Sequence, residues 1–152
     1  QYRLVLIGNS DEMGDEFQSS MVRLGIAEKV FHLNYVEEEH LTAFYREAFC
    51  FVHPSTYEGF ALPVVEALAC GTPTIIANAG AMVEVADGAA LVVDSLESLA
   101  EAMIALVENP SRREEMIRRG LERAQKLSWA KTASAFMSAI ESACEKRNTG
   151  EP

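Results

Sequence analysis

The chain has 152 residues, a formal net charge of −10 and an ordinary globular composition, with 49% apolar and 24% charged residues. This composition excludes disordered, collagen-like and coiled-coil chains, and the length corresponds to about one domain. No apolar run approaches the roughly 20 residues that span a bilayer, and no basic face for a nucleic-acid backbone is visible. The sequence therefore predicts a globular protein with no transmembrane segment and no nucleic-acid partner.

Apolar runs typical of strands alternate with helical patterns over the first two thirds of the chain. The expected strands are Leu4–Ile7, Val30–Val36, Phe49–His53, Thr74–Ala77 and Ala89–Val93. The expected helices are Asp11–Leu24, Glu38–Ala48 and Pro63–Cys70, with a short helical turn around Met82–Ala86. Alternation of this kind implies crossover connections and a parallel sheet, and continuously apolar central runs are typical of strands covered on both faces. We expect an α/β fold with a Rossmann-like parallel sheet flanked by helices.

Three further helices are predicted to follow without strands. Ser95–Glu108 has apolar residues at helical spacing, and Asn109 with Pro110 ends that pattern. Ser111, with Glu114 three residues later, matches a capping box for the next helix. Ser128 can cap the last helix, which carries Trp129, Phe136, Met137 and Ile140 on or near one face. We expect one domain over residues 1–147 and a frayed tail over residues 148–152.

The three cysteines are far apart in the sequence and have no zinc-ligand spacing. Cys50, Cys70 and Cys144 each stand among apolar or small residues, so we expect small buried side chains and no metal site. Reduced thiols are typical of the cytoplasm, which is the location we predict.

Residues 48–83 are nearly free of charge, and Glu58 and Glu66 are their two charged residues. Glu66 falls in a helix so apolar that we expect it to be largely buried. It is then either a structural acid satisfied by donors or a carboxylate that binds ligand hydroxyls. Glu58 follows a strand, at the edge where ligands bind in open α/β sheets, although an ordinary loop acid fits equally well.

The segment between the two acids suits a phosphate group. Gly59–Leu62 leads into a helix N-terminus, whose amides bind anions. Pro63 suits the first helical position and Gly71 the position just past the helix end. Carboxylates for hydroxyls and amides for a diphosphate together indicate a nucleotide sugar as ligand.

The run EGFALPVVEA at residues 58–67, followed by ACGTP at residues 69–73, resembles the E-x7-E segment of retaining group 1 glycosyltransferases of the GT-B fold. The likeness extends to Leu4–Gly8, Leu24–Ile26 with Val30–Phe31, His53–Ser55, Glu84 and Ser128–Trp129, and so covers most of the chain. It identifies the chain as similar to the C-terminal, donor-binding domain of that family.

The resemblance implies hexose transfer from a nucleoside-diphosphate sugar with no cofactor and no metal. Carried over by position, Glu58 would be the catalytic residue, which contacts the donor sugar hydroxyls and supports the reacting face, and Glu66 would hold the ribose hydroxyls. Tyr35 and Val36 would border the base. The remaining donor-binding residues would be Gly59, Phe60, Ala61 and Leu62, through their backbone amides.

The chain departs from the family pattern at three places. Ala61 stands where the family often has Gly, and residues 80–84 read GAMVE where it often has Gly-Gly-x-Pro-Glu. The family's first strand with its basic Gly-rich turn, and the N-terminal domain, are not in this sequence. We therefore expect most of the donor half of a two-domain enzyme, inactive alone. Its N-terminal domain would be its partner and would supply any attachment to the inner membrane face.

Two other functions remain open at this point. A related GT-B sugar-nucleotide epimerase would share the fold, although the Glu58/Glu66 spacing with Gly-Thr-Pro favours transfer. A non-catalytic flavodoxin-like module is weakly allowed by Asp11 and Glu12 after the first strand, but no matching Lys follows a later strand. Gly8 and Gly14 do not have dinucleotide spacing, so NAD binding is not expected. His53 could face the donor or lie in the core, and His32 and His40 are weaker candidates.

Overall fold

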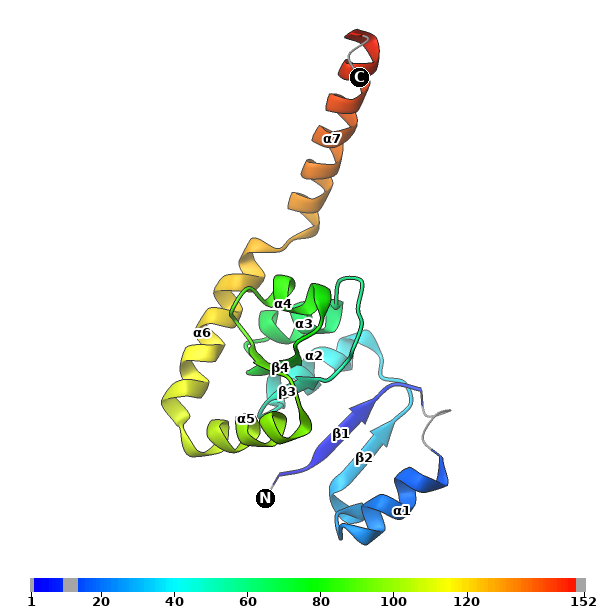
Figure 1. The fold of residues 1–152 in the computed structure, drawn as a ribbon, viewed down its shortest axis with the longest axis vertical. Coiled ribbons are helices and arrows are strands. Elements are labelled where there is room, and N and C mark those ends of the chain that lie inside the picture. Colours follow the sequence, from blue (N-terminus) through cyan, green and yellow to red (C-terminus); the bar gives the residue numbers. More distant parts are fainter. Residues whose placement is uncertain (1, 10–13, 150–152) are drawn as a thin grey trace. The chain divides into compact units, whose positions relative to one another are not determined.

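The computed structural model describes the backbone of residues 2–9 and 14–149, with side chains as far as Cys144 (Figure 1). Two compact units divide the chain, Gln1–Ala43 and Phe44–Pro152, and each is described by itself.

The first unit contains a two-stranded parallel sheet. Strand β1 (Leu4–Ile7) pairs with β2 (Val30–Leu33), with Leu4 opposite Val30. Helix α1 (Asp15–Arg23) and the 3-10 turn η1 (Ala27–Lys29) connect them. Helix α1 begins at Asp15, with Gly14 as its N-cap, and the first residues of the predicted helix, Asp11 to Met13, lie outside the described part.

Strand β2 ends earlier than the sequence predicts. The expected strand ran to Val36, but Tyr35 and Val36 lie on the loop before helix α2 (Glu38–Glu47), which continues into the second unit.

The second unit is built on three parallel strands, β3 (Phe51–His53), β4 (Thr74–Ala77) and β5 (Leu91–Val93), in that order. Helices α3 (Leu62–Ala69) and α4 (Gly80–Ala86) connect them. Within the described residues each unit thus contains one parallel ladder, and the α/β fold with parallel strands flanked by helices is confirmed. Apolar runs locate strands, but only backbone hydrogen bonds decide which strands are neighbours.

Helices cover both faces of β4, as the continuously apolar strand predicts. Successive strand residues point to opposite faces, and Ile75 and Ile76 are both fully buried in different apolar clusters. Ile76 packs with buried residues of α3 and α4. Ile75 packs with Leu106 of α5 (Leu96–Glu108) and Met116 of α6 (Pro110–Lys126). The close contact of α6 with α3 occurs at Gly120, where a Cβ would lie 3.1 Å from Leu68 Cδ2.

The caps of the later helices differ in part from the prediction. Asn109 caps α6, because its side chain accepts a hydrogen bond from the Arg112 amide at 3.0 Å. The predicted capping box at Ser111 is therefore wrong: Pro110, with its preset φ, already occupies the first helical position. Ser95 and Ser98 form a capping box on α5. Ser128 caps α7 (Trp129–Thr149) as predicted, by accepting from the Lys131 amide at 3.2 Å.

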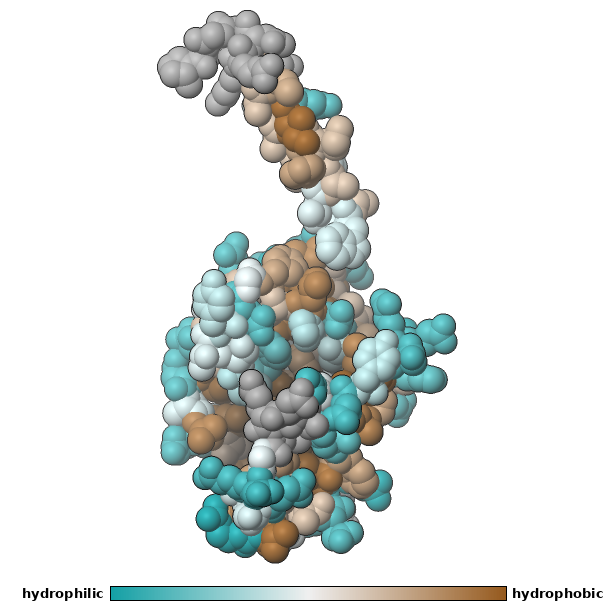
Figure 2. Space-filling view, turned by 90° about the vertical axis from the view of Figure 1, so that its right-hand side faces the viewer, coloured by the Kyte–Doolittle hydropathy of each residue, from teal (hydrophilic) through white to brown (hydrophobic). Residues whose placement is uncertain are grey.

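Helix α7 carries exposed apolar side chains and extends past the predicted domain boundary. Its backbone is helical through Thr149, because no glycine or proline interrupts it before Gly150. Residues 150–152 of the predicted tail lie outside the described part. Cys144 is exposed, against the expectation of burial, as are Trp129, Phe136, Met137 and Ile140. Figure 2 shows apolar side chains on the surface of this helix, at the top of the view.

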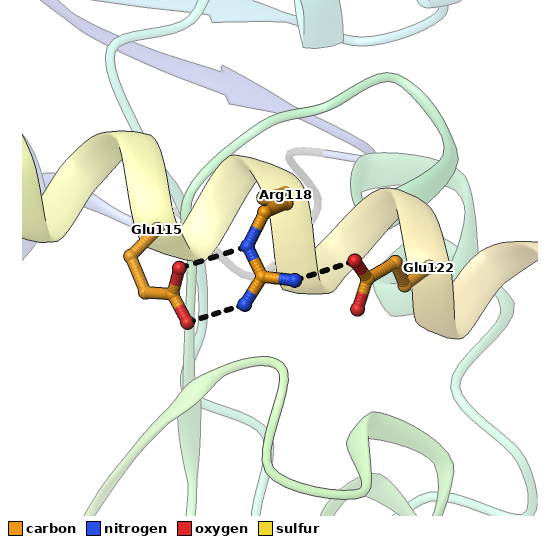
Figure 3. Close-up of polar contacts among 3 residues, drawn as sticks. All are labelled: Glu115, Arg118 and Glu122. Atoms are coloured by element: carbon orange, nitrogen blue, oxygen red, sulfur yellow. Dashed lines mark hydrogen bonds and ion pairs between the residues drawn. The ribbon is translucent and has the colours of Figure 1, made fainter.

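The charged face of α6 carries ion pairs between residues three and four positions apart. Arg118 donates two hydrogen bonds to Glu115, at 2.7 and 2.9 Å, and a third to Glu122 one turn later (Figure 3). All three side chains are more than half exposed, so their contribution to stability is small. Among the described helices, none has both the length and the apolar character that crossing a membrane requires.

Candidate functional site

The loop from β3 to α3 brings Glu58 and the amides of the predicted site to the carboxyl end of β3. Ala61 is the N-cap of α3, with φ 65° and ψ 60°, and it is 4% exposed. Leu62 is the first helical residue and Pro63 the second, one position later than predicted. Proline is tolerated there because the first amides of a helix have no intrahelical partner. The Val64 amide donates to the Ala61 carbonyl at 3.0 Å.

The far end of α3 confirms the predicted glycine cap. Gly71 has φ 73°. Its amide donates to the Leu68 carbonyl at 3.1 Å, and the Thr72 amide donates to the Ala67 carbonyl at 3.0 Å. This pair of hydrogen bonds is a Schellman motif, which satisfies the last carbonyls of the helix. Both ends of α3 are thus determined, and with them the position of Glu66.

Glu66 is exposed, so the expectation that it is largely buried is wrong. Helix α3 buries Val64, Ala67 and Leu68, which lie three and four residues apart on one face. Glu66 falls on the opposite side, with Leu62 and Ala69, which are also exposed. The high apolar content of α3 does not indicate which face of the helix is exposed, so the exposure of Glu66 was not predicted. A desolvated structural acid is therefore excluded for Glu66 in this chain.

Tyr45, on the last turns of α2, holds the Glu66 carboxylate. Its hydroxyl donates to Glu66 Oε2 at 3.1 Å. The backbone carbonyl of Tyr45 accepts a hydrogen bond of 2.7 Å from the buried Thr72 hydroxyl. Burial, with smaller contributions from the charge and the hydrogen bond of Glu66, raises the pKa of Tyr45 well above its usual range. The phenol therefore keeps its proton and remains a donor to Glu66.

Glu58 is held in a similar way by His53, the last residue of β3. His53 Nε2 lies 3.1 Å from Glu58 Oε1, and the side chains are 19% and 33% exposed. A carboxylate only accepts hydrogen bonds, so this geometry assigns the hydrogen to Nε2. The histidine thus contacts an acid of the predicted site.

Three rings connect the two acids. The Tyr45 ring meets the Phe51 ring edge-on, with centroids 5.3 Å apart and planes at 82°. The Phe51 ring stacks on that of His53 at 5.7 Å and 22°. Sequence reasoning missed Tyr45 and Phe51. One signal could have found Tyr45: a tyrosine close to a predicted buried strand has a hydroxyl that needs a hydrogen-bond partner.

The other predicted site residues are distributed over both units. Phe60 is 48% and Leu62 46% exposed. Tyr35, 76% exposed, donates to Glu37 Oε2 at 3.4 Å in the first unit, and Val36 lies beside it. The roles of all these residues stay predictions. Within the described residues, no group of three His, Cys, Asp or Glu side chains could hold a metal ion.

The parallel sheet covered by helices on both faces, with acids on the loop and helix after β3, defines a Rossmann-like α/β domain of the GT-B type. The chain belongs to the family of group 1 glycosyl transferases, whose model matches residues 1–123.

Relatives and solved structures agree with this assignment. The chain is 33% identical over 144 residues to O-antigen chain mannosyltransferase B of Escherichia coli, covering 93% of this chain and 38% of that protein. Sucrose-phosphate synthase from Thermosynechococcus elongatus matches with a TM-score of 0.82 and 25% identity, over 94% of this chain and 39% of that one. Anabaena HepE in complex with UDP-glucose matches with a TM-score of 0.83 and 19% identity, over 92% of this chain and 41% of that one. The chain thus spans about two fifths of each protein's length.

Proposed function

We propose that this chain is the donor half of a retaining glycosyltransferase that transfers a hexose from a nucleoside-diphosphate sugar. The observation that carries the proposal is the pair of acids eight residues apart, Glu58 and Glu66, each held by a ring from a neighbouring element. They lie within the segment that the family model matches. The UDP-glucose complex of HepE, a protein of the same fold, supports a nucleotide-sugar ligand.

The proposed roles follow from the charges and positions of the two acids. Glu66 is exposed and accepts ribose hydroxyls, for which a carboxylate is a strong acceptor. Glu58 lies at the carboxyl end of β3 and faces the donor sugar. When the nucleoside diphosphate leaves, positive charge develops on the sugar ring, and a nearby carboxylate stabilises that charge in the transition state. The amides around Ala61 and Leu62 contact the diphosphate.

Steady-state kinetics of Glu58→Gln in the enzyme with its N-terminal domain tests the role of Glu58. Glutamine keeps the size and removes the charge, so the loss falls on the transition state. We expect kcat to fall by about 100-fold, the effect typical of one lost electrostatic contact, at a similar KM for the donor. Glu101→Gln, on the exposed part of α5, is the matched control. A raised KM with unchanged kcat would assign Glu58 to binding alone.

The reaction itself is tested by product analysis with UDP-glucose and GDP-mannose as donors. NMR of the product gives its anomeric configuration, and a product with the donor's configuration supports retention. Inversion would contradict the retaining mechanism. Conversion of the donor into its epimer without an acceptor would instead establish an epimerase. The cytoplasmic location stays a prediction.

A further inference from the structure

The two acids of the proposed site lie at the two ends of one contact path in the second unit. From Glu58 the path runs through the His53, Phe51 and Tyr45 rings to Glu66. Its two hydrogen bonds are both 3.1 Å long, and its ring centroids are 5.3 and 5.7 Å apart. We call these three side chains the ring row.

The ring row stands on α2 and β3 and is held by packing and a backbone hydrogen bond. Phe51 and His53 are two residues apart on β3, so their side chains share one face of the strand. Phe51 packs against the apolar cluster of α3 and α4. Tyr45 is held through its carbonyl by the Thr72 hydroxyl. Glu58 stands on a loop and Glu66 on an exposed helix face, where each carboxylate has several rotamers available.

We infer that Tyr45 and His53 are positioning residues, which hold Glu66 and Glu58 in the orientations that bind the donor, and that Phe51 supports both rings. The inference rests on the proposed function of the two acids. A carboxylate that is already oriented loses less side-chain entropy when a ligand binds, so preorganisation raises affinity without adding a contact to the ligand. Tyr45 and His53 act through the acids and do not touch the donor themselves.

Tyr45→Phe removes the hydroxyl and leaves the ring contact with Phe51 in place. We expect the affinity for UDP or GDP, measured by calorimetry on the enzyme with its N-terminal domain, to fall by about 3- to 10-fold, the value of one hydrogen bond. kcat should change little. Tyr57→Phe is the matched control, because Tyr57 is 85% exposed and contributes to neither hydrogen bond. An unchanged affinity in Tyr45→Phe would overturn the role of Tyr45.

His53 is tested by comparing two substitutions. His53→Ala removes the donor to Glu58, and we expect kcat to fall by about 10-fold with the donor KM nearly unchanged. His53→Gln keeps an N–H donor near the place of Nε2, so it should restore most of kcat. His40→Gln, on the exposed face of α2, is the control. Equal losses in His53→Ala and His53→Gln, or a loss confined to KM, would overturn the positioning role of His53.

A double-mutant cycle separates positioning from an independent role. If Tyr45 acts through Glu66, then Tyr45→Phe costs no further affinity in the Glu66→Ala background. Additive losses would overturn the positioning role while leaving Glu66 in the proposed site. If Glu66→Ala alone leaves affinity unchanged, the proposed function fails at Glu66, and positioning by Tyr45 fails with it. Urea unfolding of each variant shows that the fold is retained.

Discussion

Ala61 is the residue at which local strain and burial oppose each other. A non-glycine residue in the left-handed region costs about 1–2 kcal/mol, because its Cβ approaches the backbone. Replacing it by glycine removes that strain but loses a buried methyl group, about 0.8 kcal/mol. Glycine also loses about 0.5–1 kcal/mol more backbone entropy on folding. These terms nearly cancel, which explains how alanine is tolerated at φ 65°.

We predict that Ala61→Gly changes the free energy of unfolding by less than about 1 kcal/mol, because the terms above cancel. Ala61→Val should cost about 2–4 kcal/mol, since a β-branched side chain adds left-handed strain to overpacking at a position that is 4% exposed. Urea denaturation of both variants measures the difference. If valine were tolerated as well as glycine, the left-handed conformation of Ala61 would be contradicted.

Glu66 allows the binding and structural roles to be separated, because it is exposed. We predict that Glu66→Ala lowers the affinity for UDP or GDP by about 10- to 100-fold, since charged hydrogen bonds are worth about 1.5–3 kcal/mol each. The unfolding free energy should change by no more than about 0.5 kcal/mol, as for other surface positions. Calorimetry and urea denaturation, with Glu101→Ala as the control, give both numbers. Unchanged affinity with lower stability would make Glu66 a structural residue.

Two arginines of α6, Arg118 and Arg123, differ in whether they connect this helix to another element. Arg118 pairs with Glu115 and Glu122 of its own helix, where solvent screens the charges. Arg123, 19% exposed in its side chain, instead donates to α4: Nε to the Val85 carbonyl at 2.7 Å and Nη2 to the Glu84 carbonyl at 3.1 Å. These carbonyls belong to the last turn of α4, so Arg123 links α6 to the C-terminal end of that helix.

We predict that Arg123→Ala lowers the unfolding free energy by about 1.5–3 kcal/mol, because it removes charged hydrogen bonds to carbonyls of α4. Arg123→Lys should recover little of this free energy, since an ammonium group cannot reproduce the planar arrangement of guanidinium N–H donors. Arg118→Ala, measured by the same urea titration, serves as the exposed comparison and should change stability much less. Equal losses for Arg118 and Arg123 would contradict the anchoring role of Arg123.

The elements that the sequence predicts best are those bounded by strong local signals. Leu4–Ile7 and Thr74–Ala77 match the observed strands residue for residue, because a turn residue follows each apolar run, Gly8 and Asn78 respectively. The glycine cap of α3 was also predicted, since glycine followed by proline prevents continuation. The parallel direction of the strands was predicted from the alternation with helices, but the order of the strands was not, because the ladder partners of a strand lie far away in the sequence.

The candidate site was likewise predicted where local sequence carries the signal, and missed where the contact joins distant segments. The acids Glu58 and Glu66 were found from composition, as isolated charges in an uncharged segment. The ring row was not found, because Tyr45 and Glu66 are 21 residues apart and meet only after α2, β3 and α3 have packed. The burial of Glu66 was predicted wrongly because helix composition says nothing about which face is covered.

At the scale of the whole molecule, the net charge and the length of the chain both affect how well this chain alone can bind a donor. The net charge of −10 repels a diphosphate at long range. A full donor site would offset this charge with the two basic residues, an Arg and a Lys, that the family resemblance implies for its first strand and turn. The chain spans 38% of the length of O-antigen chain mannosyltransferase B, the rest of which has no counterpart here.

We predict that the 152-residue chain alone binds UDP or GDP weakly and transfers no sugar. Glu58, Glu66 and the amides before α3 are present, so we expect part of the proposed donor site to form. The absence of the two contacts from basic residues, each worth about 1.5–3 kcal/mol, moves the dissociation constant of a micromolar site towards the millimolar range. Without an opposite domain, no acceptor is positioned and water enters the site, so transfer has no oriented nucleophile. Ligand-observed NMR with UDP and GDP measures the binding, and a radiolabelled donor assay measures transfer. Micromolar affinity, or sugar transfer above the uncatalysed rate, would show that the 152 residues form a complete donor site.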